Sequence, residues 1–238
     1  MTFLQMQTDA LDLLHELQNH TQYSLPKLKH YINQGCIVFA RRTRCIEGTV
    51  DITTVSNQFE YDESDAATLA NILVPYHVRY VDGTENGIPL KPWVGGYTNL
   101  PKSYSYGTPY FYWLRNVHTK SQTAPTAYTG VRFGTWPICG TADKTLRIVA
   151  FMKPSTLVAD ADTVEFKEDW HDAPVHYAVY KIYQMFSHLR PGWDKKSKEH
   201  IALFDRIVSD AIEDMSIQSD EPIEIEDVYY EMDNYFGY

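Results

Sequence analysis

Histidines and carboxylates are the side chains of this sequence that could bind a metal ion. His171 and His176 are five residues apart around a predicted helix start, whereas two imidazoles share one helix face at a spacing of three or four. The acidic stretch ADADTVEFKED (159–169) lacks the central glycine and the twelfth-position glutamate of a calcium-binding loop. We therefore expect no metal site, and we interpret 159–169 as a turn that leads from a last strand into a helix.

The known motifs for catalysis and for nucleotide binding are missing from the sequence. There is no GxxxxGK[ST] or GxGxxG loop for phosphate and no GxSxG turn for a serine nucleophile. His118 and His188 have no obvious nucleophile nearby in the sequence, although a triad that forms only in space stays open. We predict no catalytic residues, no cofactor and no enzymatic activity.

The tyrosine-rich segment YTNLPKSYSYGTPYFYW (97–113) is the remaining candidate for ligand binding. Its rings could stack on sugars or bases, but Lys102 and Arg115 are the only cations nearby, which is weak support for a nucleic-acid platform. Tyrosine and tryptophan bring large contact areas with a polar tip, so the pattern favours packing in a core or an interface.

The surplus of negative charge lies at one end of the sequence. The chain has 31 acidic and 21 basic residues; ten acids and no base lie in 207–238, and the remaining 21 acids balance the 21 bases. This balance gives no global basic field for binding nucleic acid through counterion release. The one dense basic cluster, Arg41, Arg42 and Arg44, is interpreted as the last turn of a helix, where cations interact favourably with the helix dipole.

The acidic end is also rich in aromatic residues. An acidic run such as SDEPIEIEDVYYEMDNYFGY (219–238) is usually a solvated, disordered end. The rings make this one unusually apolar, however, and a segment without its own core can bury them only on a partner. We hypothesise an arm that orders on assembly, with the candidate partner-binding residues Tyr229, Tyr230, Glu231, Met232, Asp233, Tyr235, Phe236 and Tyr238.

Cysteine usage indicates a protein that folds in a reducing compartment, and hydropathy indicates no membrane span. Cys36, Cys45 and Cys139 form neither an even disulfide set nor a CxxC pair, which favours the cytosol. The longest apolar runs, 36–40 and 148–152, are far shorter than the roughly 20 residues of a membrane span. The first residues have no basic flank or cleavage site, so we expect no signal peptide.

Hydrophobic periodicity predicts helices at both ends of the chain. Apolar residues recur every three or four positions in 3–17 and, after a break at Ser24 and Pro26, in 25–39, with Glu47-Gly48 ending the second helix. A third helix begins with Asp172 as its N-cap and ends at Arg190-Pro191-Gly192, and a fourth spans about 195–215. Four such helices could bury their apolar faces against each other as a bundle.

Between the helices, short β-like runs alternate with turns rich in glycine and proline. The expected fold is therefore α+β, with a bundle-like α domain built from both ends, an inserted antiparallel β domain and an extended acidic arm. The expected domains are 1–47 and 169–215 (two helix pairs of the α domain), 48–168 (β domain) and 216–238 (arm).

Several segments, in this order, resemble the head-to-tail adaptor (connector) proteins of tailed bacteriophages. The resemblance covers about 25–215 and is carried by the segments LKHYINQGCIVFARRTRCIEG, TVDITTVSNQFEYD, VRYVDG, GTPYFYWL, VRFGTWPICGTADKTLRIVAFMKPSTLVADADTVEF, HDAPVHYAVYKIYQMFSHL and KKSKEHIALFDRIVSDAI. The long tyrosine-rich region and the acidic-aromatic end are outside the shared pattern.

The resemblance implies a structural virion protein in the neck between capsid and tail, assembled in the host cytoplasm. Such adaptors form a homo-oligomeric ring, commonly of twelve copies, that docks on the portal protein and presents a surface to the tail or to the next neck protein. Double-stranded DNA passes through the lumen without specific binding, and no membrane is involved. Another neck or tail-completion protein, or a ligand- or carbohydrate-binding β module or enzyme, are the alternatives.

Overall fold

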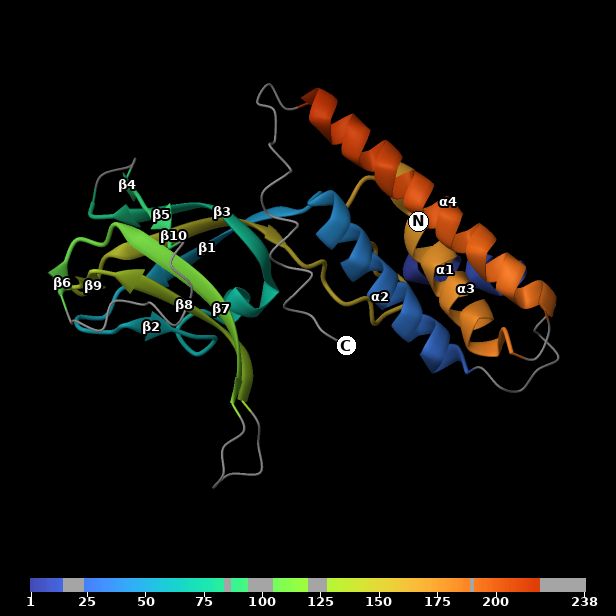
Figure 1. Ribbon diagram of the computed structural model, residues 1–238, viewed down its shortest axis with the longest axis horizontal. Coiled ribbons are helices and arrows are strands. Elements are labelled where there is room, and N and C mark those ends of the chain that lie inside the picture. Colours follow the sequence, from blue (N-terminus) through green and yellow to red (C-terminus); the bar gives the residue numbers. More distant parts are fainter. Residues whose placement is uncertain (15–23, 84–86, 94–104, 120–127, 189–190, 219–238) are drawn as a thin grey trace. The chain divides into compact units, whose positions relative to one another are not determined.

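The computed structural model describes residues 1–14, 24–83, 87–93, 105–119, 128–188 and 191–218. The protein is α+β, and it divides into two compact units. We call Met1–Cys45 together with Ser155–Tyr238 the helical unit, and Ile46–Pro154 the β unit. Figure 1 shows the helices of the one and the sheets of the other.

The helical unit has four α-helices among the described residues, as the periodicity predicts. They are α1 (Phe3–Leu13), α2 (Leu25–Thr43), α3 (Asp172–Phe186) and α4 (Pro191–Gln218), with the short 3-10 helix η4 (Glu168–Trp170) before α3. Two come from each end of the chain, on either side of the β unit.

The ends of the first two helices follow from local hydrogen bonding. Thr2 forms a capping box with Gln5: its Oγ1 accepts from the Gln5 backbone N–H at 3.3 Å, and its own N–H donates to Gln5 Oε1 at 2.7 Å. Helix α2 begins as predicted after Ser24, but it ends at Thr43 because Arg44 has a left-handed backbone with φ 57°. The prediction that α2 continues to Glu47-Gly48 was therefore wrong.

Two predicted boundaries near α3 and α4 also change. The N-cap position of α3 is His171, and Asp172 is its first helical residue. Arg190-Pro191-Gly192 was expected to end a helix, but Pro191 begins α4. The first helical N–H has no partner within the helix, so proline costs little at that position and its fixed φ suits it.

Helix α3 is the most enclosed helix of this unit. It packs against α1, α2 and α4, and Figure 1 shows it among them. Its buried residues are Ala173, Pro174, Val175, Tyr177, Ala178, Val179, Ile182, Tyr183 and Phe186. The Tyr177 ring and the Phe39 ring of α2 both contact the Phe204 ring of α4, at 5.3 and 6.5 Å between centroids.

The segment after the β unit is hydrogen-bonded to α1 and α2 and so belongs to the helical unit. The Asn33 side chain donates to the Leu157 carbonyl at 3.0 Å and accepts from the Leu157 N–H at 2.8 Å. The Phe3 N–H donates to the Asp162 carbonyl at 2.7 Å. The sequence placed residues 155–168 with the β domain, whereas the two units divide between Pro154 and Ser155.

In the part of the β unit that the structure describes, there are two four-stranded sheets and one two-stranded sheet. The first has the order β1 (Glu47–Thr53), β10 (Thr145–Met152), β3 (Ile72–Val81) and β4 (Ile88–Pro89). The second has the order β2 (Glu60–Tyr61), β8 (Tyr128–Trp136), β7 (Phe111–Thr119) and β5 (Lys91–Pro92), and the small sheet pairs β6 (Tyr106–Gly107) with β9 (Ile138–Cys139). The pairings are antiparallel, as expected, except for the short parallel pairs β5–β7 and β6–β9.

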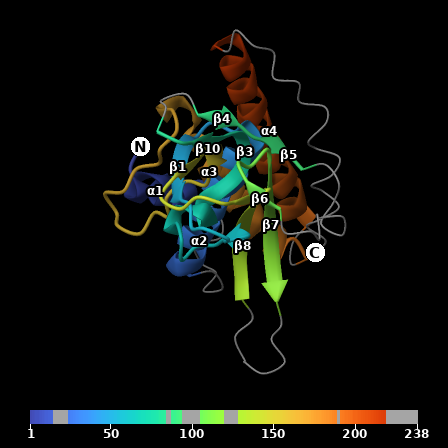
Figure 2. The ribbon, with the colours of Figure 1, turned by 90° about the vertical axis from the view of Figure 1, so that its left-hand side faces the viewer.

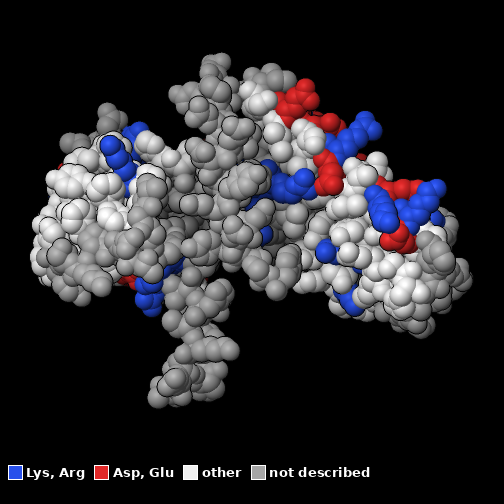
Figure 3. Space-filling view, viewed as in Figure 1, with Lys and Arg blue, Asp and Glu red and all other residues white. Residues whose placement is uncertain are grey.

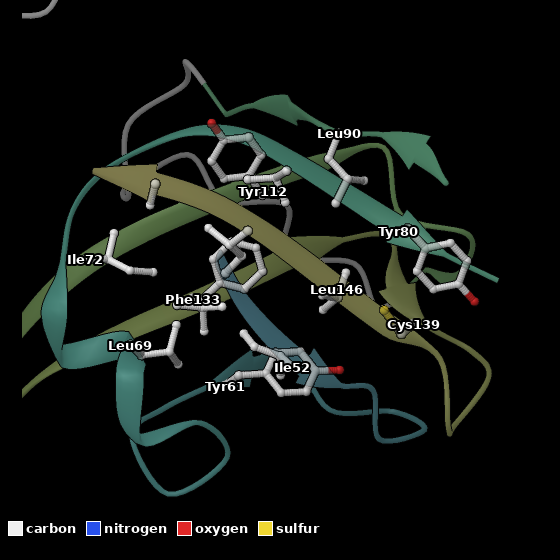
Figure 4. Packing of buried hydrophobic residues seen from close by; sticks show 14 residues of the cluster. Ile52, Tyr61, Leu69, Ile72, Tyr80, Leu90, Tyr112, Phe133, Cys139 and Leu146 are labelled. Carbon is white, nitrogen blue, oxygen red and sulfur yellow. The ribbon is translucent and has the colours of Figure 1, made fainter. Parts of the chain in front are cut away.

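One hydrophobic core serves both four-stranded sheets. Ile52 and Leu146 from the first sheet lie in the same buried cluster as Tyr61, Tyr112 and Phe133 from the second (Figure 4). The rings of Tyr112 and Phe133 stack at 5.9 Å between centroids. Burial of alternate side chains, such as Val50 and Ile52 along β1, is the pattern expected of a strand with one face on a core.

The first and last long strands of the β unit are neighbours. β1 and β10 pair antiparallel from Glu47 opposite Phe151 to Thr53 opposite Thr145. The Met152 N–H donates to the Ile46 carbonyl at 2.9 Å. The chain therefore enters and leaves the β unit at the same end of this strand pair.

Gly35 allows α2 and α3 to approach closely. A Cβ at this position would lie 2.9 Å from Pro174 Cα and 3.1 Å from the Pro174 carbonyl oxygen. We predict that Gly35→Ala lowers the free energy of unfolding by about 1–2 kcal/mol, because overpacking against backbone outweighs the helix propensity that alanine gains.

Urea unfolding followed by circular dichroism measures this change. Gly192→Ala is the matched control in the same unit, since a Cβ there meets nothing within 4 Å. It should be neutral or slightly stabilising. Equal stability of the two variants would contradict the close approach.

Candidate functional site

The predicted partner-binding residues lie outside the part of the chain that the structure describes. These are Tyr229, Tyr230, Glu231, Met232, Asp233, Tyr235, Phe236 and Tyr238. The surfaces of the described residues therefore supply the geometry of candidate assembly sites.

The β7–β8 hairpin is the longest strand pair of the second sheet. Its nine-residue strands are in register from Phe111 opposite Trp136 to Thr119 opposite Tyr128. At about 3.3 Å per residue, each strand is about 30 Å long. Among the named strands, β5 and β2 pair only with residues near the base of the hairpin, and Figure 2 shows β7 and β8 running on together beyond them.

A buried carboxylate binds the middle of this hairpin. Arg115 and Arg132 lie directly opposite each other in the register, an arrangement that would be destabilising by itself. Glu60 Oε2 accepts hydrogen bonds from both guanidinium groups, at 2.5 Å from Arg115 and 3.3 Å from Arg132. Its side chain is only 10% exposed, and Trp113 Nε1 donates to its second oxygen at 3.3 Å. Glu60 thus compensates two like charges and fixes a neighbouring indole.

The described part of the tyrosine-rich segment is buried at one end and exposed at the other. Tyr112 and Trp113 lie in the interior, which agrees with the packing interpretation. Tyr106 and Tyr110 are 55% and 57% exposed, so these two rings do not pack in the core of the unit. They form a candidate contact surface that the sequence did not separate from the buried rings.

The surface of the helical unit carries mixed charges. Along α4, Lys198 pairs with Asp194 at 2.6 Å, and Figure 3 shows basic and acidic groups close together over this unit. Arg42, from the predicted basic cluster, pairs with Asp205 at 2.5 Å and lies over the Phe204 ring. Arg41 and Arg42 are in the last turn of α2, as predicted, and Arg44 is its C-cap residue.

The acids of 159–169 are used for local structure. Asp162 accepts hydrogen bonds from the backbone N–H groups of Val158 and Ala159, at 2.7 and 2.8 Å, and these bonds lower its pKa. Asp160 pairs with Lys29 at 3.2 Å. Among the described residues, no group of three or more histidines, cysteines and acids is placed to hold a metal ion.

The two histidines that the sequence singled out have separate surroundings. His171 lies at the start of α3, and its Nε2 donates to the Phe166 carbonyl at 2.9 Å. His176 instead meets His200 of α4, with 3.2 Å between their Nδ1 atoms. The sequence missed this pair because its members are 24 residues apart, and only the packing of α3 on α4 brings them together.

Burial lowers the pKa of both members of this pair. Partial desolvation, and then the neighbouring His176, lower the pKa of His200 to about 4. Partial desolvation also lowers the pKa of His176, although Asp172 opposes the shift. Both imidazoles are therefore neutral at pH 7, and one donates its Nδ1 proton to the other.

Cys36, Cys45 and Cys139 are free. Burial raises the pKa of the Cys36 thiol to about 12, so it is not a reactive thiolate. None of the described helices is both long enough and apolar enough to cross a bilayer.

The comparisons with known proteins identify the family. A family model described as SU10 adaptor protein matches residues 1–225. The chain therefore belongs to this family, which is a family of phage head-to-tail adaptors, and the resemblance found in the sequence is confirmed. A comparison with curated proteins gives no significant match.

Family membership gives the protein a structural class and a place. It is a phage structural adaptor, located at the virion neck, of a kind that interacts with portal and tail proteins. The family is not an enzyme family. The match ends at residue 225, so the candidate contact residues 229–238 lie beyond it.

The Glu60 cluster gives a stability prediction for the β unit. Glu60→Gln leaves two opposed arginines without their carboxylate, so we expect a loss of about 2 kcal/mol in the free energy of unfolding. Urea unfolding followed by tryptophan fluorescence tests this. Asp51→Asn is the control: it removes an ion pair with Arg147 in which both side chains are nearly half exposed, and it should cost clearly less than Glu60→Gln. A similar cost for both variants would contradict the role of Glu60.

The histidine pair gives a pH prediction. Because the folded-state pKa values lie below the unfolded value of about 6.5, the unfolded chain takes up protons first as the pH falls. The contribution of the pair is complete above pH 6.5 and declines between about pH 6.5 and 4. Melting temperatures at pH 7.5 and 5.0 should therefore differ more for the wild type than for a His176→Gln/His200→Gln variant. An equal difference would show that the pair does not titrate in this way.

Proposed function

We propose that this protein is a head-to-tail adaptor that assembles as a ring, commonly of twelve copies, beneath the portal. The ring connects the capsid to the tail or to the next neck protein, and the genome passes through its lumen. The observation that carries this proposal is the match of residues 1–225 to the adaptor family. A contact between two different faces of the subunit, repeated by rotation, closes into such a ring.

The two units have different proposed roles in the ring. We propose that the helical unit, which contains the predicted helix pairs of a bundle-like α domain, gives the ring its rigid wall, supported by the enclosed position of α3. We propose that the β unit, Ile46–Pro154, offers contact surfaces, supported by the long hairpin and by the exposed rings of Tyr106 and Tyr110.

The charge distribution suits a channel for DNA. Outside 207–238 the sequence carries 21 acids and 21 bases, and the ion pairs along α4 leave no strong basic field there. DNA binding of this kind depends on many phosphate contacts with cations. A charge-balanced or acidic wall lets the duplex pass without specific binding.

The acidic-aromatic segment 216–238 is proposed as the assembly arm. Its rings, with Tyr229, Tyr230 and Phe236 among them, provide contact area on a neighbouring subunit or on the portal, and its acids meet basic groups or line the channel. Ordering on assembly costs conformational entropy, which the buried rings offset.

Removal of residues 222–238 tests the arm. We expect docking to purified portal to weaken by at least about tenfold, because the arm supplies contact area in the complex, while the free protein keeps its melting temperature. Co-sedimentation with portal measures docking, and electron micrographs of the mixture show whether rings form.

Two full-length variants separate the contribution of the aromatic rings to docking from the contribution of the acidic charges. In one, the tyrosines and Phe236 of 229–238 become serine; in the other, Glu231 and Asp233 become glutamine and asparagine. The first should weaken docking nearly as much as the deletion, and the second should mainly change its salt dependence. Undiminished docking by the deletion variant would return the segment to a solvated end, and failure of the wild type to bind portal would overturn the proposed function.

A further inference from the structure

The pair His176 and His200 joins two helices through facing imidazole nitrogens. His176 lies on α3 and His200 on α4, with 3.2 Å between the Nδ1 atoms and 5.3 Å between the ring centroids, and the rings are tilted by 39°. α3 and α4 make the most extensive helix contact of the unit. The pair is thus a polar contact within the packed interface between α3 and α4.

The surrounding side chains fix the orientation of His200. Its ring stacks on the Tyr183 ring, with 5.9 Å between centroids and 10° between planes. Tyr183 is fully buried, and its hydroxyl donates to the Leu13 carbonyl at 3.2 Å. Because stacking holds its ring, His200 is preorganised to bind a ligand through Nδ1.

The distance between the two nitrogens suits a bound metal ion as well as a hydrogen bond. Zinc–imidazole bonds are about 2.0–2.1 Å long, so two nitrogens 3.2 Å apart subtend an angle of roughly 100° at a shared ion, close to the tetrahedral angle. Imidazole nitrogens prefer zinc, copper and nickel among divalent ions.

We propose that His176 and His200 form a two-histidine site for a divalent transition-metal ion that clamps α3 to α4. Water completes the coordination, because the described residues provide no group of three ligands. At pH 7 each neutral imidazole has one lone pair, and both lone pairs are at Nδ1 once the proton of the donating Nδ1 moves to Nε2 of the same ring. The site does not depend on ring assembly, and it would stabilise the helical unit before and after docking.

Metal titration of the full-length protein tests the site. After removal of any affinity tag and of bound metal by a chelator, calorimetry with Zn²⁺ or Ni²⁺ at pH 7.5 should show one ion per chain and a higher melting temperature. His176→Gln and His200→Gln should each weaken binding at least about tenfold, since the second bond of a chelate forms intramolecularly. His30→Gln, which removes an exposed histidine on α2, should leave binding unchanged.

A second measurement uses only the wild-type protein, so it does not require any variant to fold. X-ray absorption at the zinc edge of the wild-type complex counts imidazole ligands, and we expect two. Wild-type binding no tighter than that of either single variant, equal loss in the His30→Gln variant, or fewer than two imidazoles at the ion would overturn the proposal.

Discussion

The burial of α3 is the constraint on which the helical unit depends. Nine of its fifteen residues are buried, and they face in several directions around the helix. A helix that is apolar on most sides must be covered on most sides. Since its partners α1 and α2 precede the β unit and α4 follows it, the chain can satisfy α3 only by bringing both of its ends together. The closeness of α2 and α3 at Gly35 is one result.

In the β unit, the corresponding constraint is the compensation of two like charges. A hairpin that places Arg115 opposite Arg132 requires a carboxylate, and the short strand β2 supplies it through Glu60. A two-residue strand adds little pairing energy, so its position follows from this ion cluster and from the buried Tyr61 ring beside it. The cluster therefore joins β2 to the middle of the hairpin.

Long periodic elements could be predicted from the sequence, whereas contacts between distant elements could not. The four helices follow from apolar spacing, because local periodicity reports which face is buried, and the β region follows from short β-like runs between turns. The helix end predicted at Pro191 was wrong because a proline that can end one helix also suits the first turn of the next. The His176–His200 and Glu60–Arg132 contacts carry no local signal, since 24 and 72 residues separate their members and tertiary packing alone unites them.

The adjacency of β1 and β10 has a consequence for evolution. Paired antiparallel residues lie about 4.5–5.5 Å apart between Cα atoms, so residues 46 to 154 leave and rejoin the helical unit almost at one point. Domains with neighbouring ends can be inserted, exchanged or lost with little effect on the host fold. Exchange of such an insert takes two crossovers in the gene, one on each side of residues 46–154, and it leaves the sequence of the helical unit intact.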